Sequence, residues 1–170
     1  VANTTFEGPA REILRLGFLG TIHPLGDLLF NPLAGPGDED YRNLYVAMGD
    51  GRAGEAPGTT HPHPQRLDAL VGKILRITPD ANLRPADELS GNGRYRIPST
   101  GSSPNPFVSS TLSGVRKEIY AYGFRNPHRM SWDAASDSLF VNDIGFHAYE
   151  ELNLIRRGGN YGYAKREGVE

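Results

Sequence analysis

Arg125-Asn126-Pro127-His128-Arg129 places four polar side chains directly after residues 118–124, a run with the alternation of a β-strand. Proline lacks an N–H and keeps the preceding residue extended, so the simplest interpretation is a loop that ends the strand. A strand end on a rigid scaffold can also hold side chains in a fixed direction toward a ligand. The planar guanidinium of Arg125 offers donors that suit carboxylate or phosphate groups. The local sequence leaves both interpretations open.

Two further segments carry residue types that can act on a ligand. His23 stands between strand-like runs, where a single histidine is most often a solvated surface residue. The run DIGF at 143–146, followed by Glu150-Glu151, combines carboxylates with an irregular glycine turn. Ca²⁺ takes six to eight oxygen ligands, including backbone carbonyls, and such a turn can point carbonyls at one centre. Paired glutamates at a strand start can also be an ordinary solvated edge, and this alternative remains open for Glu150.

Two other clusters receive no role. His61 and His63 flank a proline and have no third metal ligand nearby, so we interpret them as solvated. The run DGRAG at 50–54 follows a strand, but neither a clear helix nor a Lys-Ser/Thr pair follows it. Both are needed by a phosphate-binding loop, so we exclude a nucleotide site here.

Composition favours a turn-rich β protein whose partners are small molecules or proteins. Of 170 residues, 21 are glycine and 13 are proline, which is too many for a mostly helical chain. The net charge of -2 gives no basic field for nucleic acid. No run approaches the ~20 apolar residues of a membrane span. Cysteine is absent, which excludes disulfides and leaves oxygen or imidazole as ligands for any metal.

Short strand-like runs separated by turn residues account for most of the chain. No segment has a sustained helical period of apolar residues, and the best helical candidate is the short run 64–70. The connection 80–117 is long for a compact domain, which indicates a functional segment or an insertion. The predicted strands are residues 12–16, 27–30, 43–48, 73–78, 118–124, 129–132, 138–141 and 151–155.

These strands fall into two similar groups. DLLFNP, LYVAMGDG, GKILRITP and EIYAYG are followed by HRMSWD, SLFVNDIG, EELNLI and NYGYA. The second member of each group ends in an aspartate with a glycine within two residues. Repeated meanders of short strands are typical of β-propeller blades. We predict that residues 27–124 form one four-stranded antiparallel blade and that residues from 129 onward build most of the next.

Several of these phrases together resemble the glucose/sorbosone dehydrogenase family, the soluble aldose sugar dehydrogenases that depend on pyrroloquinoline quinone (PQQ). The resemblance implies an all-β fold, a partial six-bladed β-propeller with about two to three blades of four-stranded antiparallel sheet. It identifies residues 1–170 as an internal fragment of a single propeller domain, and we expect both termini to be cut. The matching phrases are HPLGDLLFNP (23–32), LYVAMGDG (44–51), LDALVGKILRITPD (67–80), EIYAYGFRNPHRMSWD (118–133), DIGFHAYEELNLI (143–155) and GGNYGYAKREG (158–168).

The resemblance implies a catalytic base and a cofactor contact. His23 matches the family's general base, which takes the proton from the C1 hydroxyl of the sugar as hydride passes to the quinone. Imidazole suits this role because its unperturbed pKa is about 6.5. Arg125 and Asn126 match the pair at the channel mouth, where the arginine contacts PQQ. A fixed guanidinium can bind one of the PQQ carboxylates in bidentate fashion.

The resemblance also implies two calcium sites. The backbone carbonyls of Gly145 and Phe146 would hold the Ca²⁺ that bridges PQQ to the protein. A second Ca²⁺ would use the Glu151 carboxylate and the Tyr161 backbone. Phe146 stands where relatives commonly have Pro or Gln, which a carbonyl ligand tolerates because its side chain is not used.

The function that this resemblance implies is PQQ- and Ca²⁺-dependent oxidation of an aldose to its lactone by the intact protein. The electrons pass to an external acceptor, the location is periplasmic or secreted, and the isolated fragment is expected to be inactive. Relatives of this propeller also serve as non-catalytic extracellular protein-binding modules, and fold alone does not separate the two functions. A lectin-like propeller would carry exposed aromatic residues in each blade, and Trp132 is the only tryptophan.

Overall fold

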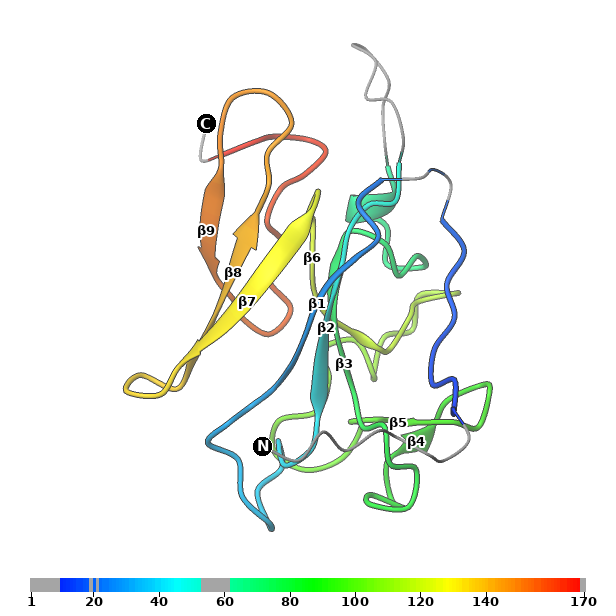
Figure 1. Cartoon of the computed structure of the whole chain (residues 1–170). Coiled ribbons are helices and arrows are strands. Elements are labelled where there is room, and N and C mark those ends of the chain that lie inside the picture. The colour runs from blue at the N-terminus through cyan, green and yellow to red at the C-terminus, as the bar shows by residue number, and fades with distance from the viewer. Residues whose placement is uncertain (1–9, 19, 21, 53–61, 169–170) are drawn as a thin grey trace.

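The computed structural model describes residues 10–168 except 19, 21 and 53–61. This part of the chain is built from β-strands and loops with a single turn of 3-10 helix (Figure 1), so the predicted all-β class is confirmed. Within these residues no helix is long and apolar enough to cross a membrane. The elements are β1 (Leu25–Phe30), β2 (Leu44–Met48), η1 (His63–Gln65), β3 (Lys73–Ile77), β4 (Glu88–Leu89), β5 (Arg96–Ile97), β6 (Ile119–Tyr122), β7 (Pro127–Asp133), β8 (Ser138–Asp143) and β9 (Glu151–Leu154).

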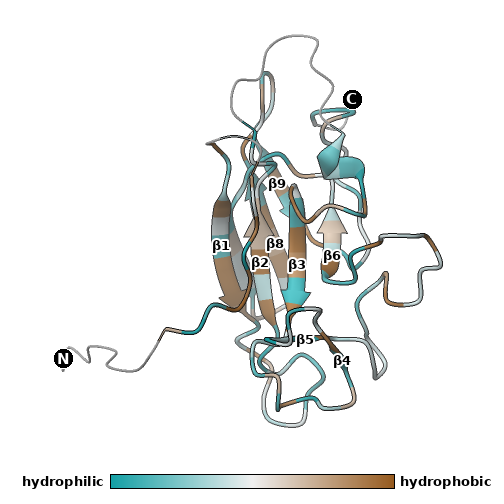
Figure 2. Ribbon diagram, turned by 90° about the vertical axis from the view of Figure 1, so that its right-hand side faces the viewer, coloured by the Kyte–Doolittle hydropathy of each residue, from teal (hydrophilic) through white to brown (hydrophobic). Residues whose placement is uncertain are grey.

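The first sheet is antiparallel, with strand order β1-β2-β3-β6. The predicted four-stranded blade between residues 27 and 124 is therefore confirmed. Every residue of β3 and all but the first of β2 are buried, because both faces of these central strands are covered. The hydrophobic stretches of β1, β2 and β8 are visible in Figure 2.

The second sheet contains β7, β8 and β9, also antiparallel, and its strand β7 lies beside β1 and β2 (Figure 1). The ring of Tyr45 makes edge contacts with Tyr120 and Trp132, with ring centroids 5.1 and 5.3 Å apart. Such edge contacts add to the stabilisation that comes from buried apolar area. The buried residues of this inter-sheet core are Tyr45, Ala47, Ile74, Ala121, Phe124, Met130, Leu139, Val141 and Ile155.

The second sheet confirms the prediction that residues from 129 onward build most of another blade, with two differences. The segment NYGYA does not add a fourth strand to this sheet. It instead makes a single parallel bridge, from Asn160 to Tyr122 of the first sheet. Strand β7 begins at Pro127 rather than at residue 129. Proline is tolerated at this position because the first residue of a strand need not donate an N–H to the ladder.

Three other predicted segments differ from the structure. Residues 12–16 form no strand, because their apolar side chains pack on the first sheet without ladder hydrogen bonds. The predicted helix at 64–70 is reduced to η1, after which Arg66 is extended. The long connection 80–117 contains the hairpin β4–β5, which is joined to the end of β3 by a bridge between Thr78 and Arg96.

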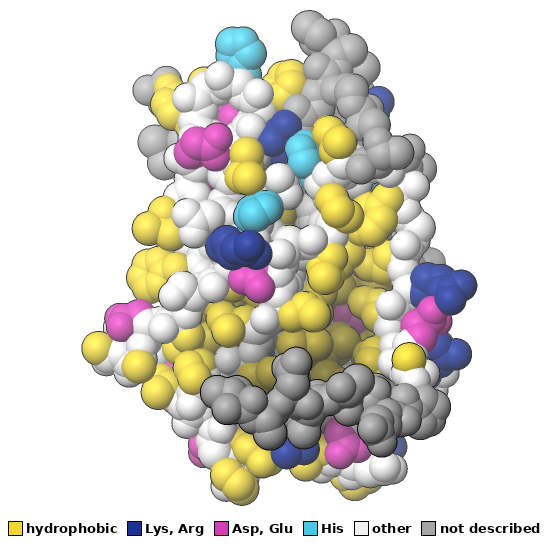
Figure 3. All heavy atoms as spheres, viewed as in Figure 1, with side chains coloured by type: hydrophobic (Ala, Val, Ile, Leu, Met, Phe, Trp, Pro, Cys, Tyr) yellow, Lys and Arg dark blue, Asp and Glu magenta, His cyan; other side chains and the backbone are white. Residues whose placement is uncertain are grey.

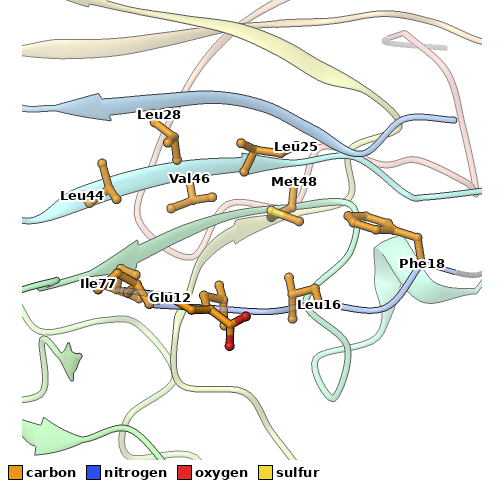
Figure 4. A pocket seen from close by; sticks show the side chains of 11 residues that line it. Glu12, Leu16, Phe18, Leu25, Leu28, Leu44, Val46, Met48 and Ile77 are labelled. Atoms are coloured by element: carbon orange, nitrogen blue, oxygen red, sulfur yellow. The ribbon is translucent and has the colours of Figure 1, made fainter. Parts of the chain in front are cut away.

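The outer face of the first sheet is only partly covered. A cavity of about 400 Å³ lies between β1, β2 and residues 12–18, and its lining is apolar except for Glu12 (Figure 4). Hydrophobic side chains gather on the face shown in Figure 3. Leu25, Leu28 and Phe30 of β1 keep 47%, 50% and 49% of their surface exposed. The edge strand β1 of the first sheet therefore presents apolar side chains that the described residues only partly cover.

A buried lysine at the start of β3 is hydrogen-bonded to the η1 segment. Lys73 is fully buried, and its ammonium donates to the carbonyls of His63, Pro64 and Val71 at 2.8, 2.9 and 2.7 Å. Burial lowers the pKa of Lys73 to about 7, because the charged form loses its hydration and the carbonyls compensate only in part.

This lysine leads to a prediction about stability and pH. Between about pH 7 and about pH 10.5 the unfolded chain keeps a proton on Lys73 that the folded chain releases. The free energy of unfolding therefore rises with pH across this window, on the order of 1.4 kcal/mol for each unit of pKa shift. We expect Lys73→Met to abolish this rise. Chemical denaturation of the full-length protein at several pH values measures the free energy of unfolding. If this free energy depended on pH in the same way in the wild type and in the variant, the prediction would be contradicted.

Candidate functional site

Loops from both sheets meet at one end of the strands. The segment before β1 is joined to the residues after β2, because Gly49 and Gly51 donate their N–H groups to the carbonyls of Pro24 and His23 at 2.9 and 3.1 Å. Asp50, between these glycines, donates its N–H to the carbonyl of Arg125 at 2.8 Å. The structure thus brings together the segments of His23 and Arg125, which are far apart in the sequence.

His23 is held by a buried carboxylate. Its Nδ1 lies 2.9 Å from Oδ1 of Asp50, and its side chain keeps 11% of its surface exposed. A carboxylate at Nδ1 fixes the ring and keeps the proton on that nitrogen, so that Nε2 is the proton acceptor. His23 has a φ of 50°, and a Cβ on Gly49 would lie 2.3 Å from the His23 carbonyl oxygen. Only glycine fits beneath this histidine.

Asp50 was not predicted as a functional residue. The pattern at residues 50–54 was interpreted only as a possible nucleotide loop, which was excluded, and Ala53 and Gly54 lie outside the described residues. The available signal was the repeat of an aspartate at the end of the second strand of each group. Asp50 follows β2 by two residues, and Asp143 is the last residue of β8.

Asp143 plays a similar role beneath Arg125 and Asn126. Its carboxylate accepts the backbone N–H groups of Arg125 and Asn126 at 3.0 and 2.6 Å. Burial raises the pKa of Asp143 to about 7, and these two hydrogen bonds oppose the rise. The carboxylate therefore holds the turn that precedes β7 in a fixed position.

The Arg125 side chain reaches the predicted calcium turn. Arg125 is buried, donates from a terminal guanidinium nitrogen to the Ile144 carbonyl at 2.9 Å, and places its guanidinium carbon 5.7 Å from the centre of the Phe146 ring. A guanidinium over an aromatic face is attracted by the ring quadrupole. The structure thus brings Arg125 next to Gly145 and Phe146, two of the other predicted site residues.

The turn itself is organised by two glutamates. Gly145 donates its N–H to Glu150 at 3.2 Å, whereas the next four N–H groups, from residues 146–149, contact the carboxylate of Glu167. A Cβ on Gly145 would lie 1.6 Å from the Tyr149 carbonyl oxygen, so the turn has no room for a side chain there. Glu167 was not predicted, because only its membership of the phrase GGNYGYAKREG distinguished it.

The residues of the second predicted calcium site also lie together. Glu151 and Tyr161 line one cavity of about 360 Å³, together with Glu150. The Glu151 carboxylate accepts the Gly168 N–H at 2.6 Å and the Asn153 side-chain amide at 3.0 Å. The Tyr161 ring stacks on Phe124, with centroids 4.6 Å apart. The structure thus brings together Glu151 and Tyr161, the two residues predicted for the second calcium site.

Side chains alone would not hold a metal here. Among the described residues, no group of three or more His, Asp or Glu side chains is arranged to bind a metal ion. A Ca²⁺ at these turns would need backbone carbonyls in addition to any carboxylate.

Comparison with known proteins gives a match to a family of sugar dehydrogenases and to several individual relatives. The family model described as Glucose / Sorbosone dehydrogenase matches residues 86–170, half of the chain. HIPL1 protein of Arabidopsis thaliana is 38% identical over 164 residues, which cover 94% of this chain and 21% of the relative. Aldose sugar dehydrogenase YliI of Escherichia coli K12 is 32% identical over 120 residues, which cover 71% of this chain and 25% of the relative.

Among the similar solved structures is one that contains PQQ. The PQQ-bound form of aldose sugar dehydrogenase from Streptomyces coelicolor superposes with a TM-score of 0.56 at 30% identity. The match covers 88% of this chain and 33% of that one. The chain therefore spans about a fifth to a third of the proteins that it resembles.

Proposed function

Because this chain belongs to the glucose/sorbosone dehydrogenase family and forms part of a β-propeller, we propose that the full-length protein oxidises an aldose to its lactone with PQQ and Ca²⁺. The observation that carries the proposal is that His23, Arg125 and the Gly145 turn lie at one end of the two sheets. An external acceptor takes the electrons, and we also propose a periplasmic or secreted location, as the family resemblance implies.

The residues of this end fit the two cofactors. The turn at residues 145–149 and the cavity at Glu151 and Tyr161 offer oxygen donors, and the chain has no cysteine, so the donor set suits a hard cation such as Ca²⁺. PQQ carries carboxylates, and the guanidinium of Arg125 beside the turn supplies a matching cation. Asn126 follows on the same backbone, which Asp143 holds, and its side-chain amide would add a polar contact to the cofactor.

The chemistry assigned to this chain is a proton transfer. When bound, PQQ supplies the quinone that accepts hydride from C1 of the sugar. His23 takes the proton of the C1 hydroxyl on Nε2 while C1 loses hydride, so that the C1–OH group becomes the carbonyl of the lactone. Asp50 keeps Nδ1 protonated and stabilises the imidazolium that forms, as buried carboxylates do beside catalytic histidines.

We predict that the full-length protein reduces a dye in the presence of an aldose only after both PQQ and Ca²⁺ are added. Removal of Ca²⁺ with a chelator before PQQ is added should prevent the reaction, because the carbonyls of Gly145 and Phe146 would then lack the cation that they are proposed to hold for the cofactor. Steady-state dye reduction with a panel of aldoses measures this. Absence of reduction with every aldose would favour the alternative function, a non-catalytic extracellular protein-binding propeller.

A further inference from the structure

The Glu167 carboxylate lies inside an arc of consecutive backbone N–H groups. One oxygen accepts from Phe146 at 2.5 Å and from His147 at 3.0 Å, and the other accepts from His147 and Ala148, both at 3.1 Å. Tyr149 adds a longer contact of 3.4 Å to the first oxygen. Consecutive N–H groups that converge in this way form an anion-binding concavity. Here a side chain of the same chain fills it.

This arrangement fixes the direction of two carbonyl groups. The N–H of Phe146 belongs to the same peptide group as the carbonyl of Gly145, and the N–H of His147 to that of Phe146. In a planar trans peptide these N–H and C=O bonds point in opposite directions. The only cis peptide bond among the described residues is Tyr163–Ala164. Glu167 therefore turns the carbonyls of Gly145 and Phe146 away from itself, toward one side of the turn.

The residue that follows Glu167 contacts the other predicted calcium site. Gly168 donates its N–H to the Glu151 carboxylate at 2.6 Å. Gly168 has a φ of +72°, and a Cβ there would lie 2.9 Å from the Tyr149 ring, so the position requires glycine. Glu167 and Gly168 together link the turn at 145–149 to Glu151.

We propose that Glu167 is a positioning residue for the cofactor's Ca²⁺. It acts by orienting the carbonyls of Gly145 and Phe146, and its own carboxylate oxygens are occupied by N–H groups. The proposal rests on the proposed function, which assigns these two carbonyls to Ca²⁺. Without Glu167, the four N–H groups would turn to water and the carbonyls would lose their common direction.

The test compares two variants of the full-length protein. We measure PQQ binding by fluorescence or calorimetry as a function of Ca²⁺ concentration. Glu167→Ala should raise the Ca²⁺ concentration for half-maximal PQQ binding by about tenfold or more, since it removes several charge-assisted hydrogen bonds. Glu167→Gln, which keeps one accepting oxygen and the same shape, should recover part of this affinity. At saturating Ca²⁺, both variants should approach the wild-type kcat.

The matched control is Glu39→Ala. The Glu39 carboxylate also accepts hydrogen bonds from consecutive backbone N–H groups, those of Ser102 and Ser103 at 2.5 and 2.8 Å. These residues are remote in sequence from the turn at 145–149. This variant should lower the Tm without changing the Ca²⁺ requirement. A wild-type Ca²⁺ requirement in Glu167→Ala would overturn the proposal, and so would equal weakening in Glu167→Ala and Glu39→Ala. If the wild-type protein itself binds no PQQ with Ca²⁺, the proposed function fails, and the role of Glu167 fails with it.

Discussion

Replacement of His23 by alanine in the full-length protein is expected to lower kcat by about 10²- to 10⁴-fold, the usual contribution of a positioned general base. PQQ and Ca²⁺ should remain bound, because His23 contacts Asp50 whereas Arg125 and the Gly145 turn are held by Asp143 and Glu167. The measurement is steady-state dye reduction together with the stoichiometry of bound PQQ. Full activity of the His23→Ala protein would remove this residue from the mechanism.

Asp50→Asn is the informative companion variant. It keeps a side chain of the same shape beside Nδ1 but removes the charge that stabilises an imidazolium. We expect a loss of kcat that is smaller than in His23→Ala, because the imidazole is still present. An Asp50→Asn protein with wild-type kcat at every pH would show that the contact of 2.9 Å between the two residues has no part in the reaction.

The 170-residue chain on its own is expected to show no aldose-dependent dye reduction, even with PQQ and Ca²⁺ in excess. In the proposed site Arg125 would provide one charge-assisted contact to the cofactor, worth roughly 1.5–3 kcal/mol. Micromolar binding requires about 8 kcal/mol. The half-exposed apolar residues of β1 and the cavity beside them also favour self-association of the isolated chain over an ordered site.

Dye reduction by the isolated chain, compared with the full-length protein at equal concentration, measures this. Size-exclusion chromatography of the same samples serves as the control for self-association. Aldose-dependent activity of the monomeric 170-residue chain would contradict the prediction and would mean that two sheets are enough to bind PQQ.

The two sheets could be predicted from the sequence because their signals are local. Short runs rich in apolar residues, such as 44–48 and 138–143, define strands by themselves, and the turn residues between them favour antiparallel neighbours. Residues 12–16 are also a short run rich in apolar residues but form no strand, because pairing depends on a partner edge that the local pattern does not specify. The hairpin β4–β5 was missed for the opposite reason, since strands of two residues are too short to show a period.

The site was predictable only in part. Positions at strand ends, such as His23 and Arg125, could be expected to meet because antiparallel neighbours bring alternate loops to the same edge. Asp50 could have been recognised from its place after β2, whereas Glu167 lies in a loop and meets residues 146–149 only through the tertiary fold. No local periodicity encodes such a contact.

A single-turnover experiment tests the central claim most directly, because it needs no knowledge of the electron acceptor. The full-length protein loaded with PQQ and Ca²⁺ is mixed with an aldose in the absence of oxygen and dye, and the absorbance of the quinone is followed. We predict that the oxidised cofactor is reduced in one turnover by the wild-type protein, and far more slowly by the His23→Ala protein. An absorbance that stays unchanged with every aldose tested, although PQQ is bound, would contradict the account.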